Sequence, residues 1–264
     1  MGQVIPIGEH LRSWRQRRRM SQLDLACEAD ISTRHVSFLE TGRARPSRDM
    51  VLHLAERLEV PLRERNVLLV AAGFAPVFAE RSLDDPALVA AREAVELVLA
   101  AHEPYPAIAV DRHWTLIAAN KASGRIFGGV AAELTNPPVN ALRLALHPEG
   151  LAKRTVNFAE WRSDLLARLR RQVETTGDPQ LTALYDELSR YPAPPQKGLR
   201  HAPNPTAVAV PLLLDSELGV LSLLSTITVF GTPVDVTVSE LAIETFLPAD
   251  RATADALRRL SVDG

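Results

Sequence analysis

The chain has 264 residues, 46% of them hydrophobic, and this length favours two domains because single hydrophobic cores stop growing at roughly 250–300 residues. No apolar run approaches the ~20 residues that span a bilayer, and the N-terminus lacks the apolar stretch of a signal peptide, so we expect a cytoplasmic protein without membrane contacts. The net charge is −2, but residues 1–76 hold 12 Arg against 9 acidic residues, whereas the remainder holds 18 basic against 23 acidic residues.

The apolar spacing near the N-terminus predicts a helix over about 8–19, with Trp14 in the core. The stretch SQLDLACEADISTRHVSFLETGRARP, residues 21–46, predicts two short helices joined by a tight turn. Ser21 and Ser32 are suited to cap these helices, and Gly42 can end the second one in the left-handed conformation. The predicted inward positions are Leu25, Ala26, Ala29, Val36 and Leu39.

The outward side chains at the start of the second helix are placed as in a helix-turn-helix, whose second helix enters the major groove of DNA. Arg34 can donate two hydrogen bonds to a guanine edge, while the remaining polar side chains can bind bases or phosphates. The predicted DNA-binding residues are Gln22, Ser32, Thr33, Arg34, Ser37, Phe38, Arg43 and Arg45. The alternative is a helical hairpin whose arginines are merely solvated and bind no DNA.

This segment resembles the xenobiotic-response-element-type, phage-repressor-like helix-turn-helix family. The matching positions are Met20-Ser21-Gln22, Leu25-Ala26, Ile31-Ser32, Val36-Ser37, Leu39-Glu40, Gly42 and Pro46-Ser47. The longer run SFLETGRARPSRDMVLHLAERLEVPLRERNVLLVAAGFAP, residues 37–76, resembles a narrower group: bacterial transcription regulators with an MmyB-like ligand-binding domain behind the helix-turn-helix.

Two further helices complete the first domain, one capped by Ser47 and one that starts at Pro61 and ends at Gly73. We therefore expect an all-α bundle of five helices over residues 1–76, a linker over 77–84 and a second domain over 85–264. A basic domain ahead of an acidic one suits a DNA-binding domain joined to a sensor or dimerisation domain.

The second domain is predicted to mix helices and strands. Helices are expected over about 86–102, 121–127, 139–146, 158–173, 179–188 and 250–260. Strands are expected over 107–110, 114–119, 206–214, 218–230 and 241–247, with a short edge segment at 234–238 and a loop over 191–205. This pattern predicts an α+β domain in which an antiparallel five-stranded sheet carries helices on one face. A hairpin followed by an Asn-capped helix resembles the opening of a PAS-type sensor fold.

No catalytic or metal-binding motif stands out. The seven histidines are scattered without zinc-ligand spacing, and no nucleophile elbow, dinucleotide fingerprint or phosphate loop is present. The single cysteine, Cys27, forms no internal disulfide and is predicted to pack inside its helix bundle. We expect no enzyme, no catalytic residue, no metal and no cofactor.

The MmyB-like resemblance implies a sensor domain that binds a fatty-acid-like ligand in an apolar pocket. The segment NALRLALHPEGLAKRTVNFAEW, residues 140–161, resembles the most distinctive stretch of that group, and Arg143 could grip a ligand carboxylate in two-pronged geometry. The predicted ligand-binding residues are Leu142, Arg143, Leu146, His147, Asn157, Trp161 and Leu165. Core packing, an ion pair with a nearby acid, and a helix end are the alternatives for Trp161, Arg143 and His147.

We also expect a homodimer, because helix-turn-helix proteins commonly bind two half-sites about one DNA turn apart. The helix over 85–102 or the sheet would supply the interface. The alternative to sensing is a DNA-bound scaffold whose second domain dimerises or recruits a protein and holds no ligand.

Overall fold

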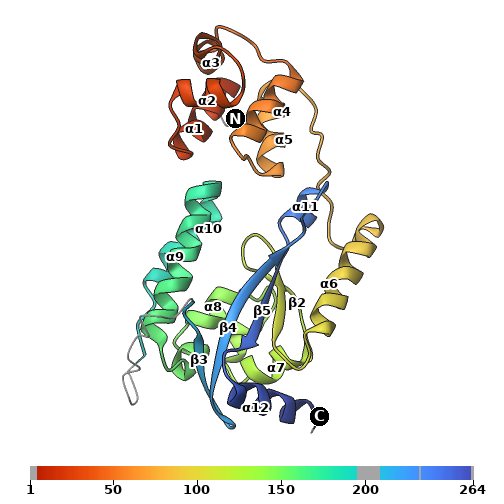
Figure 1. Cartoon of the computed structure of the whole chain (residues 1–264), viewed down its shortest axis with the longest axis vertical. Coiled ribbons are helices and arrows are strands. Elements are labelled where there is room, and N and C mark those ends of the chain that lie inside the picture. The colour runs from red at the N-terminus through yellow and green to blue at the C-terminus, as the bar shows by residue number, and fades with distance from the viewer. Residues whose placement is uncertain (1–4, 195–208, 232, 263–264) are drawn as a thin grey trace. The chain divides into compact units, whose positions relative to one another are not determined.

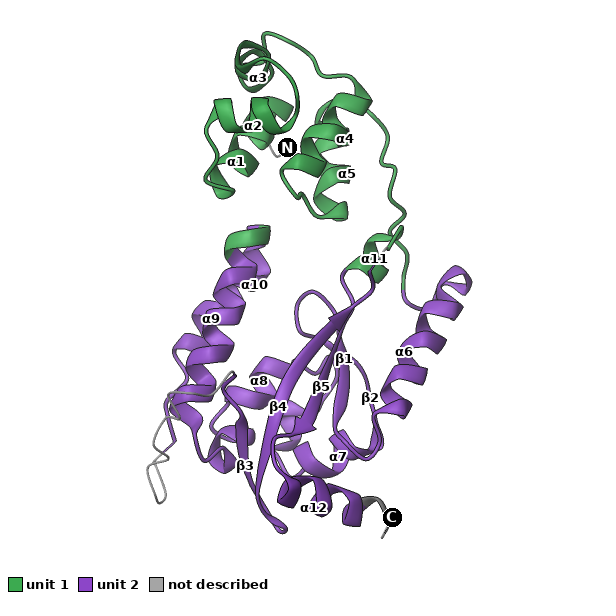
Figure 2. Cartoon of the chain, in the orientation of Figure 1, with its two compact units in different colours: residues 1–82, 174–176, 232–239 green, residues 83–173, 177–231, 240–264 purple. Residues whose placement is uncertain are grey.

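The computed structural model describes residues 5–194, 209–231 and 233–262. The chain forms two compact units, shown in Figure 2. The first comprises residues 1–82, 174–176 and 232–239, and the second comprises residues 83–173, 177–231 and 240–264. Each unit is described separately below.

The first unit contains the predicted bundle of five helices (Figure 1), formed by α1 (Ile7–Arg17), α2 (Gln22–Glu28), α3 (Thr33–Glu40), α4 (Arg48–Arg57) and α5 (Leu62–Ala71). Serine hydroxyls cap three of them: Ser21, Ser32 and Ser47 each accept a backbone N–H three residues ahead. The apolar faces meet in one core, whose members include Leu11, Trp14, Leu25, Val36, Leu39, Leu54 and Leu68.

Two observations refine the predicted packing of α2 and α3. Cys27 is exposed rather than buried, because the inward face of α2 is already formed by Leu25 and Ala26. Gly42 ends α3 with a φ of 72°, as expected for a left-handed helix end.

The second unit begins with a 3₁₀ turn, Pro86–Leu88, and helix α6 (Val89–Ala101). Its strands are β1 (Ala107–Val110), β2 (Leu116–Ala119), β3 (Leu212–Ser216), β4 (Gly219–Val229) and β5 (Ala242–Pro248). Between β2 and β3 lie α7 (Lys121–Phe127), α8 (Ala141–Leu146), α9 (Phe158–Thr176), α10 (Pro179–Ser189) and the 3₁₀ turns Ala132–Leu134 and Leu151–Arg154. After β5 comes α12 (Arg251–Val262).

The five strands form one antiparallel sheet in the order β2-β1-β5-β4-β3, so the first and last strands in sequence lie side by side at its centre. This is the predicted α+β, PAS-like sheet domain. Within the sheet, Ile108 pairs with Glu244 across β1 and β5, and Leu224 pairs with Leu247 across β4 and β5.

Helices cover both faces of the sheet, not one face as the sequence suggested. Ala107 and Ala109 of β1 pack with Val95 and Leu99 of α6. The alternate residues of β1, Ile108 and Val110, belong instead to the large core formed with α7, α8, α9 and α10. The reason is that β1 is buried on both sides, and its unbroken apolar run AIAV does not show this two-faced burial by alternation.

Three predicted segments differ from the structure. The expected edge segment at 234–238 is largely the short helix α11 (Val236–Ser239), which Asp235 starts by accepting the Thr237 N–H at 2.9 Å. Strand β2 begins at Leu116 rather than 114, because Trp114 has a φ of 65°, which breaks extended backbone. Strand β3 begins at Leu212, and the part of its predicted span at 206–208 lies outside the described residues.

Candidate functional site

A buried ion pair holds the first three helices together. Arg15 donates two hydrogen bonds to the Glu40 carboxylate, at 2.6 and 2.9 Å, and a third to the Met20 carbonyl at 2.8 Å. The Glu40 side chain is only 3% exposed. Burial raises the pKa of Glu40, but hydrogen bonds from Arg15 and Gln22 outweigh it, so that the pKa lies below its ordinary value.

The outward face of α3 carries the side chains that the sequence predicts to meet DNA. Thr33 and Arg34 are exposed, whereas Ser37 and Phe38 are half-buried. The Arg34 guanidinium lies 5.1 Å from the centre of the Phe38 ring, and that of Arg43 lies 5.9 Å from it. Two arginine side chains thus make cation–π contacts with the same aromatic ring near the end of α3. These contacts restrict the conformations of both side chains in the free protein.

Two of the predicted DNA-binding residues already have structural roles. The Ser32 hydroxyl caps α3 by accepting the His35 N–H at 3.1 Å. The Gln22 amide donates to Glu40 at 2.8 Å. Arg45 is exposed in the loop after α3. Contacts of these three residues with DNA stay predictions.

Part of the arginine excess stabilises helix ends. Arg18 donates to the carbonyls of Leu58 and Glu59 at the end of α4, at 2.8 and 2.7 Å, and Arg65 donates to the Val60 carbonyl at 2.7 Å. These cations occupy the place where a helix terminus carries partial negative charge. Arg34, Arg43 and Arg45 have no such structural task among the contacts described, and they remain the candidates for phosphate and base contacts.

The second unit contains a partly open apolar cavity of about 300 Å³ between the sheet and its helices. Its wall combines strand residues, such as Ile108, Leu116 and Phe246, with helix residues, such as Phe127 of α7. This volume lies at the lower end of the range of small-molecule sites. The further lining residues are Ala119, Ser123, Gly124, Gly128, Thr135, Val139, Ala141, Leu142, Leu144, Ala145, Leu151, Thr155, Trp161, Leu165, Leu212 and Glu244.

Three of the seven predicted ligand-binding residues line this cavity: Leu142, Trp161 and Leu165. They come from α8 and α9, so the predicted segment does contribute to the wall. Leu146 is fully buried in the surrounding core and lies outside the lining. The three remaining residues, all polar, are also absent from the lining.

Each of those polar residues has a protein partner. Arg143 donates two hydrogen bonds to Glu187, at 2.8 and 2.7 Å, on the exposed side of α8, so its two-pronged grip is already occupied. The His147 ring meets Tyr191 edge-on at 5.1 Å. Asn157 does not use its side chain to cap α9; it donates to the Pro211 carbonyl and accepts the Leu213 N–H, which fixes β3.

Sequence reasoning missed the most unusual wall residue, Glu244. It is 4% exposed and sits in the central strand β5, where it accepts a hydrogen bond from Arg168 of α9 at 2.9 Å and another from Ser225. The available signal was that Glu244 is the only charged residue of strand β5, because charged residues are almost never fully buried unless paired.

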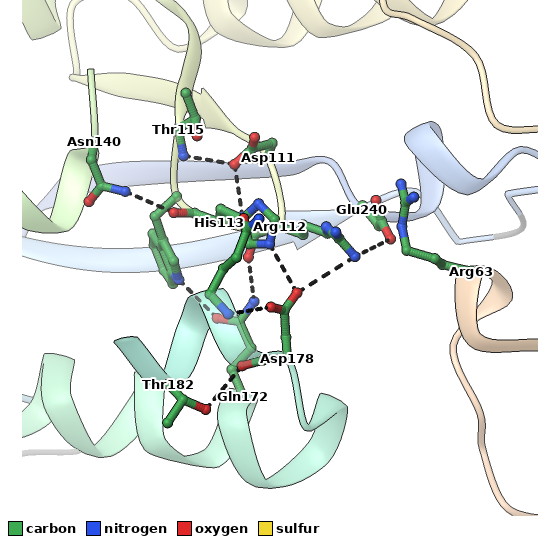
Figure 3. A network of polar contacts seen from close by, with 12 residues as sticks. Arg63, Asp111, Arg112, His113, Thr115, Asn140, Gln172, Asp178, Thr182 and Glu240 are labelled. Carbon is green, nitrogen blue, oxygen red and sulfur yellow. Dashed lines mark hydrogen bonds and ion pairs between the residues drawn. The ribbon is translucent and has the colours of Figure 1, made fainter. Parts of the chain in front are cut away.

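A polar network fixes the β1–β2 turn to the α9–α10 corner (Figure 3). Asp178 accepts a hydrogen bond from His113 at 2.9 Å and lies 3.6 Å from the Arg112 guanidinium. Gln172 accepts from the Trp114 indole at 2.8 Å and donates to the Arg112 carbonyl at 2.9 Å. Burial raises the pKa of Asp178, but hydrogen bonds and the nearby cation outweigh this and lower it. The network fixes the position of the β1–β2 hairpin relative to α9, and both of these elements contribute to the cavity wall.

Neither a metal site nor a membrane-spanning helix emerges from the part of the chain that the structure describes. No group of three or more metal-ligating side chains is present there. None of its helices combines the length and apolarity needed to cross a bilayer.

Two family models match the parts of the chain that contain these candidate sites. Residues 6–68 match the family model of a helix-turn-helix domain, and residues 91–260 match that of the MmyB-like transcription regulator ligand binding domain. No curated protein matches the chain. Among solved structures, an RNA-binding light-oxygen-voltage receptor matches 98% of this chain at 14% sequence identity, and this chain spans 64% of that receptor. The TM-score of 0.27 is too low for this match to bear on the fold.

The second match covers well over half of the sequence and contains every residue that lines the cavity. The first contains α1 to α4 and most of α5, with the exposed face of α3. The chain therefore belongs to the MmyB-like transcription regulators, with a helix-turn-helix DNA-binding domain in front of a ligand-binding domain.

Proposed function

We propose that this regulator binds operator DNA as a homodimer in the bacterial cytoplasm and senses a small, apolar, fatty-acid-like molecule in its sheet domain. The cavity of about 300 Å³ is the observation that carries the sensing part of the proposal. Apolar side chains from both the sheet and the helices form most of its wall. A concave apolar wall of this kind favours an apolar chain through the hydrophobic effect.

The DNA part of the proposal rests on the exposed face of α3. Thr33 and Arg34 are free of the core, while Val36 and Leu39 anchor the opposite face of the same helix. This arrangement lets a rigid helix present side chains to a groove without disturbing its own packing. Arg43 and Arg45 follow in the loop, where they suit phosphate contacts on the flanks of the site.

Regulation requires that the ligand distinguish two states of the dimer. A ligand changes DNA affinity only if it binds the DNA-competent and the incompetent form with different free energies. The cavity wall takes residues from four of the five strands, the central strand β5 among them, so a change in the cavity can be transmitted through most of the sheet. We infer a ligand-dependent change in operator affinity.

The direct test of sensing is to release small molecules from the purified full-length chain and identify them by mass spectrometry. A thermal-shift screen with fatty acids of increasing length accompanies it. We expect an apolar chain to be released, or a rise in melting temperature that peaks at one chain length, because a cavity of about 300 Å³ accommodates a limited volume. If nothing apolar is released and no fatty acid shifts the melting temperature, a scaffold whose second domain recruits a protein replaces the sensor.

A further inference from the structure

The connection between β4 and β5 belongs to the first unit. Residues 232–239, which hold α11, lie between these two strands in sequence but group with residues 1–82 (Figure 2). Both strands are part of the sheet of the second unit, and β5 lines the cavity through Phe246. The ligand-binding domain therefore contributes one of its strand connections to the unit that contains the helix bundle.

Backbone hydrogen bonding joins this connection to the segment that follows the helix bundle, residues 77–82. Ala79 forms a parallel β-bridge with Asp235, and the Ala79 carbonyl accepts the Val236 N–H at 2.8 Å. Val236 is fully buried. Two segments that are far apart in sequence are therefore paired along their backbones.

An ion pair stabilises the same junction. The Asp235 carboxylate accepts a hydrogen bond from the Arg81 guanidinium at 2.7 Å with one oxygen, and from the Thr237 N–H at 2.9 Å with the other. The Thr237 hydroxyl donates in turn to the Arg81 carbonyl. The Asp235 side chain is 5% exposed, whereas that of Arg81 is 40% exposed. Because a buried charge must be paired, the burial of this carboxylate is compensated only while the two segments stay together.

The segment over 77–82 is also bonded to α5. The Asn66 amide donates to the Phe78 carbonyl at 2.7 Å and accepts the N–H groups of Val77 and Phe78 at 3.0 and 3.1 Å. Arg63 of α5 pairs with Glu80. The segment therefore connects a helix of the bundle with the connection that holds α11.

Only a short stretch separates α11 from the cavity wall. Two residues, Glu240 and Leu241, lie between the end of α11 and the start of β5. Leu241 is buried, and it packs in one core with Val95 and Leu99 of α6. Because close-packed side chains deform little, we expect this stretch to move with β5 rather than absorb a displacement of that strand.

We propose that the Arg81–Asp235 pair, with the bridge beside it, transmits ligand binding from the cavity to the helix-turn-helix domain. This inference rests on the proposed sensing function and specifies its regulation. A ligand that shifts β5 changes the position of α11, and the paired segment over 77–82 carries this change to α5. Coupling between distant sites is carried by such packed and hydrogen-bonded elements when the ligand favours one of their arrangements.

The experiment compares operator affinity with and without saturating dodecanoate. The full-length chain and an operator selected from random DNA are used, and fluorescence anisotropy gives both dissociation constants. The ratio of these constants is the coupling factor, and displacement of a fluorescent apolar dye gives the dodecanoate affinity separately. We expect a coupling factor of about fivefold or more for the natural chain, as for allosteric effects in general.

Two variants break the ion pair and change the net charge in opposite directions: Asp235→Asn removes a negative charge, and Arg81→Gln removes a positive one. We expect the coupling factor to fall below about twofold in both, because the connection to the segment over 77–82 is weakened. Their dodecanoate affinity should stay within about twofold of the natural value, because neither residue lines the cavity.

Arg251→Gln is the control. It removes the same positive charge as Arg81→Gln and breaks an exposed ion pair with Asp255 of α12, whose atoms lie 3.9 Å apart. We expect this variant to keep the coupling factor of the natural chain.

The outcomes distinguish this inference from the function on which it rests. An unchanged coupling factor in a folded Asp235→Asn or Arg81→Gln protein, or an equal fall in the control, would overturn the inference while sensing stands. Dodecanoate that binds the natural chain without changing its operator affinity would do the same. If Asp235→Asn does not fold, Arg81→Gln decides alone, because its half-exposed side chain leaves no cavity in the core. Failure of dodecanoate to bind the natural chain would overturn both the inference and the sensing of fatty acids.

Discussion

Arg34 and Arg43 share one aromatic ring but differ in their place relative to α3. Arg34 lies in its first turn, the part of a recognition helix that meets base edges, whereas Arg43 lies in the loop beyond its end. Both guanidinium groups lie within 6 Å of the centre of the Phe38 ring. The two residues are therefore expected to contribute to DNA binding in different ways.

If Arg34 contacts a guanine, Arg34→Ala will cost roughly 1–3 kcal/mol at the preferred site and relax the base choice there. Arg43→Ala will weaken binding to all sequences and reduce the salt dependence of the binding constant by about one unit. Fluorescence anisotropy against a set of single-base operator variants, at several salt concentrations, measures both effects. A uniform loss for Arg34→Ala would reassign it to phosphate contact, and an unchanged salt slope would remove Arg43 from the interface.

Arg143 provides a second prediction at the level of single residues. Its guanidinium pairs with Glu187 on the exposed side of α8, and the residue does not line the cavity. We expect Arg143→Gln to leave the affinity for apolar chains unchanged and to lower stability by less than about 1 kcal/mol, as for exposed ion pairs. A large loss of affinity confined to carboxylate ligands, measured by dye displacement, would restore the role that the sequence suggested.

At the scale of elements, the close approach of α1 and α3 depends on a residue without a side chain. A Cβ at Gly8 would lie 2.6 Å from the carbonyl oxygens of Leu39 and Glu40, which are backbone atoms and cannot move aside cheaply. We expect Gly8→Ala to destabilise the helix bundle by about 1–3 kcal/mol. Helix propensity alone predicts the opposite sign, because Ala favours a helix over Gly.

The control for Gly8→Ala is Gly124→Ala in α7, where an added Cβ meets no atom within 4 Å. There, propensity should prevail and stabilise the chain by about 0.5–1 kcal/mol. Denaturant unfolding followed by circular dichroism compares the two variants. Equal stabilisation by both substitutions would show that α1 and α3 do not pack as described.

The Arg15–Glu40 pair makes the stability of the first three helices depend on pH. The folded pKa of Glu40 lies below its unfolded value, so its contribution is present above the unfolded pKa and is lost as the pH falls through the folded pKa. Glu40→Gln should therefore destabilise the bundle near neutral pH, and the difference from the natural chain should shrink on acidification. Unfolding midpoints at about pH 7 and about pH 3 measure it.

Exposed Glu28 on α2 is the matched control for Glu40. Glu28→Gln should change neither the stability at neutral pH nor its dependence on pH. A constant difference between Glu40→Gln and the natural chain across this range would contradict the stabilising role of the ionised carboxylate.

The sequence predicted the elements better where local chemistry decides them. Serine caps, the spacing of apolar residues and Gly42 were sufficient for α2 and α3, because each signal lies within a few residues of its effect. The fate of 234–238 was not predictable in the same way: Val234 and Val238 favour a strand, yet Asp235 starts a helix there. Similarly, the sequence of β1 does not show that α6 covers its second face, because a short continuous apolar run can occur in a strand that is covered on one face or on both.

The candidate sites show the same division. The exposure of Thr33 and Arg34 was predictable because it follows from one helix and its period, whereas their contacts with DNA stay predictions. The cavity was predictable as a region, since Leu142, Trp161 and Leu165 line it, but not as a set of polar contacts. The partners of Arg143 and Asn157 lie 44 to 56 residues away, and such pairings depend on the tertiary fold. The burial of Glu244 in β5 likewise depends on its ion pair with Arg168, which lies on another element, α9.

For the whole molecule, the uneven distribution of charge is consistent with DNA binding by the N-terminal part and ligand binding by the remainder. The N-terminal 76 residues have more Arg than acidic residues, whereas the remainder is acidic, so the DNA backbone is attracted mainly to one part of the chain. An apolar ligand bound in the acidic part carries no charge that could attract or repel DNA. It can change the DNA affinity only by changing the conformation or dynamics of the protein. Dimerisation would let two copies of α3 contact half-sites on the same face of the duplex.

The most direct test of the regulator is selection of binding sites by the full-length chain from a random pool of duplex DNA, in the presence of heparin as a polyanion competitor. The account predicts enrichment of an inverted repeat with half-site centres about one helical turn apart, and loss of that enrichment for Arg34→Ala. A pool that stays random, with the chain displaced by heparin, would contradict recognition of DNA by α3 and with it the proposed function.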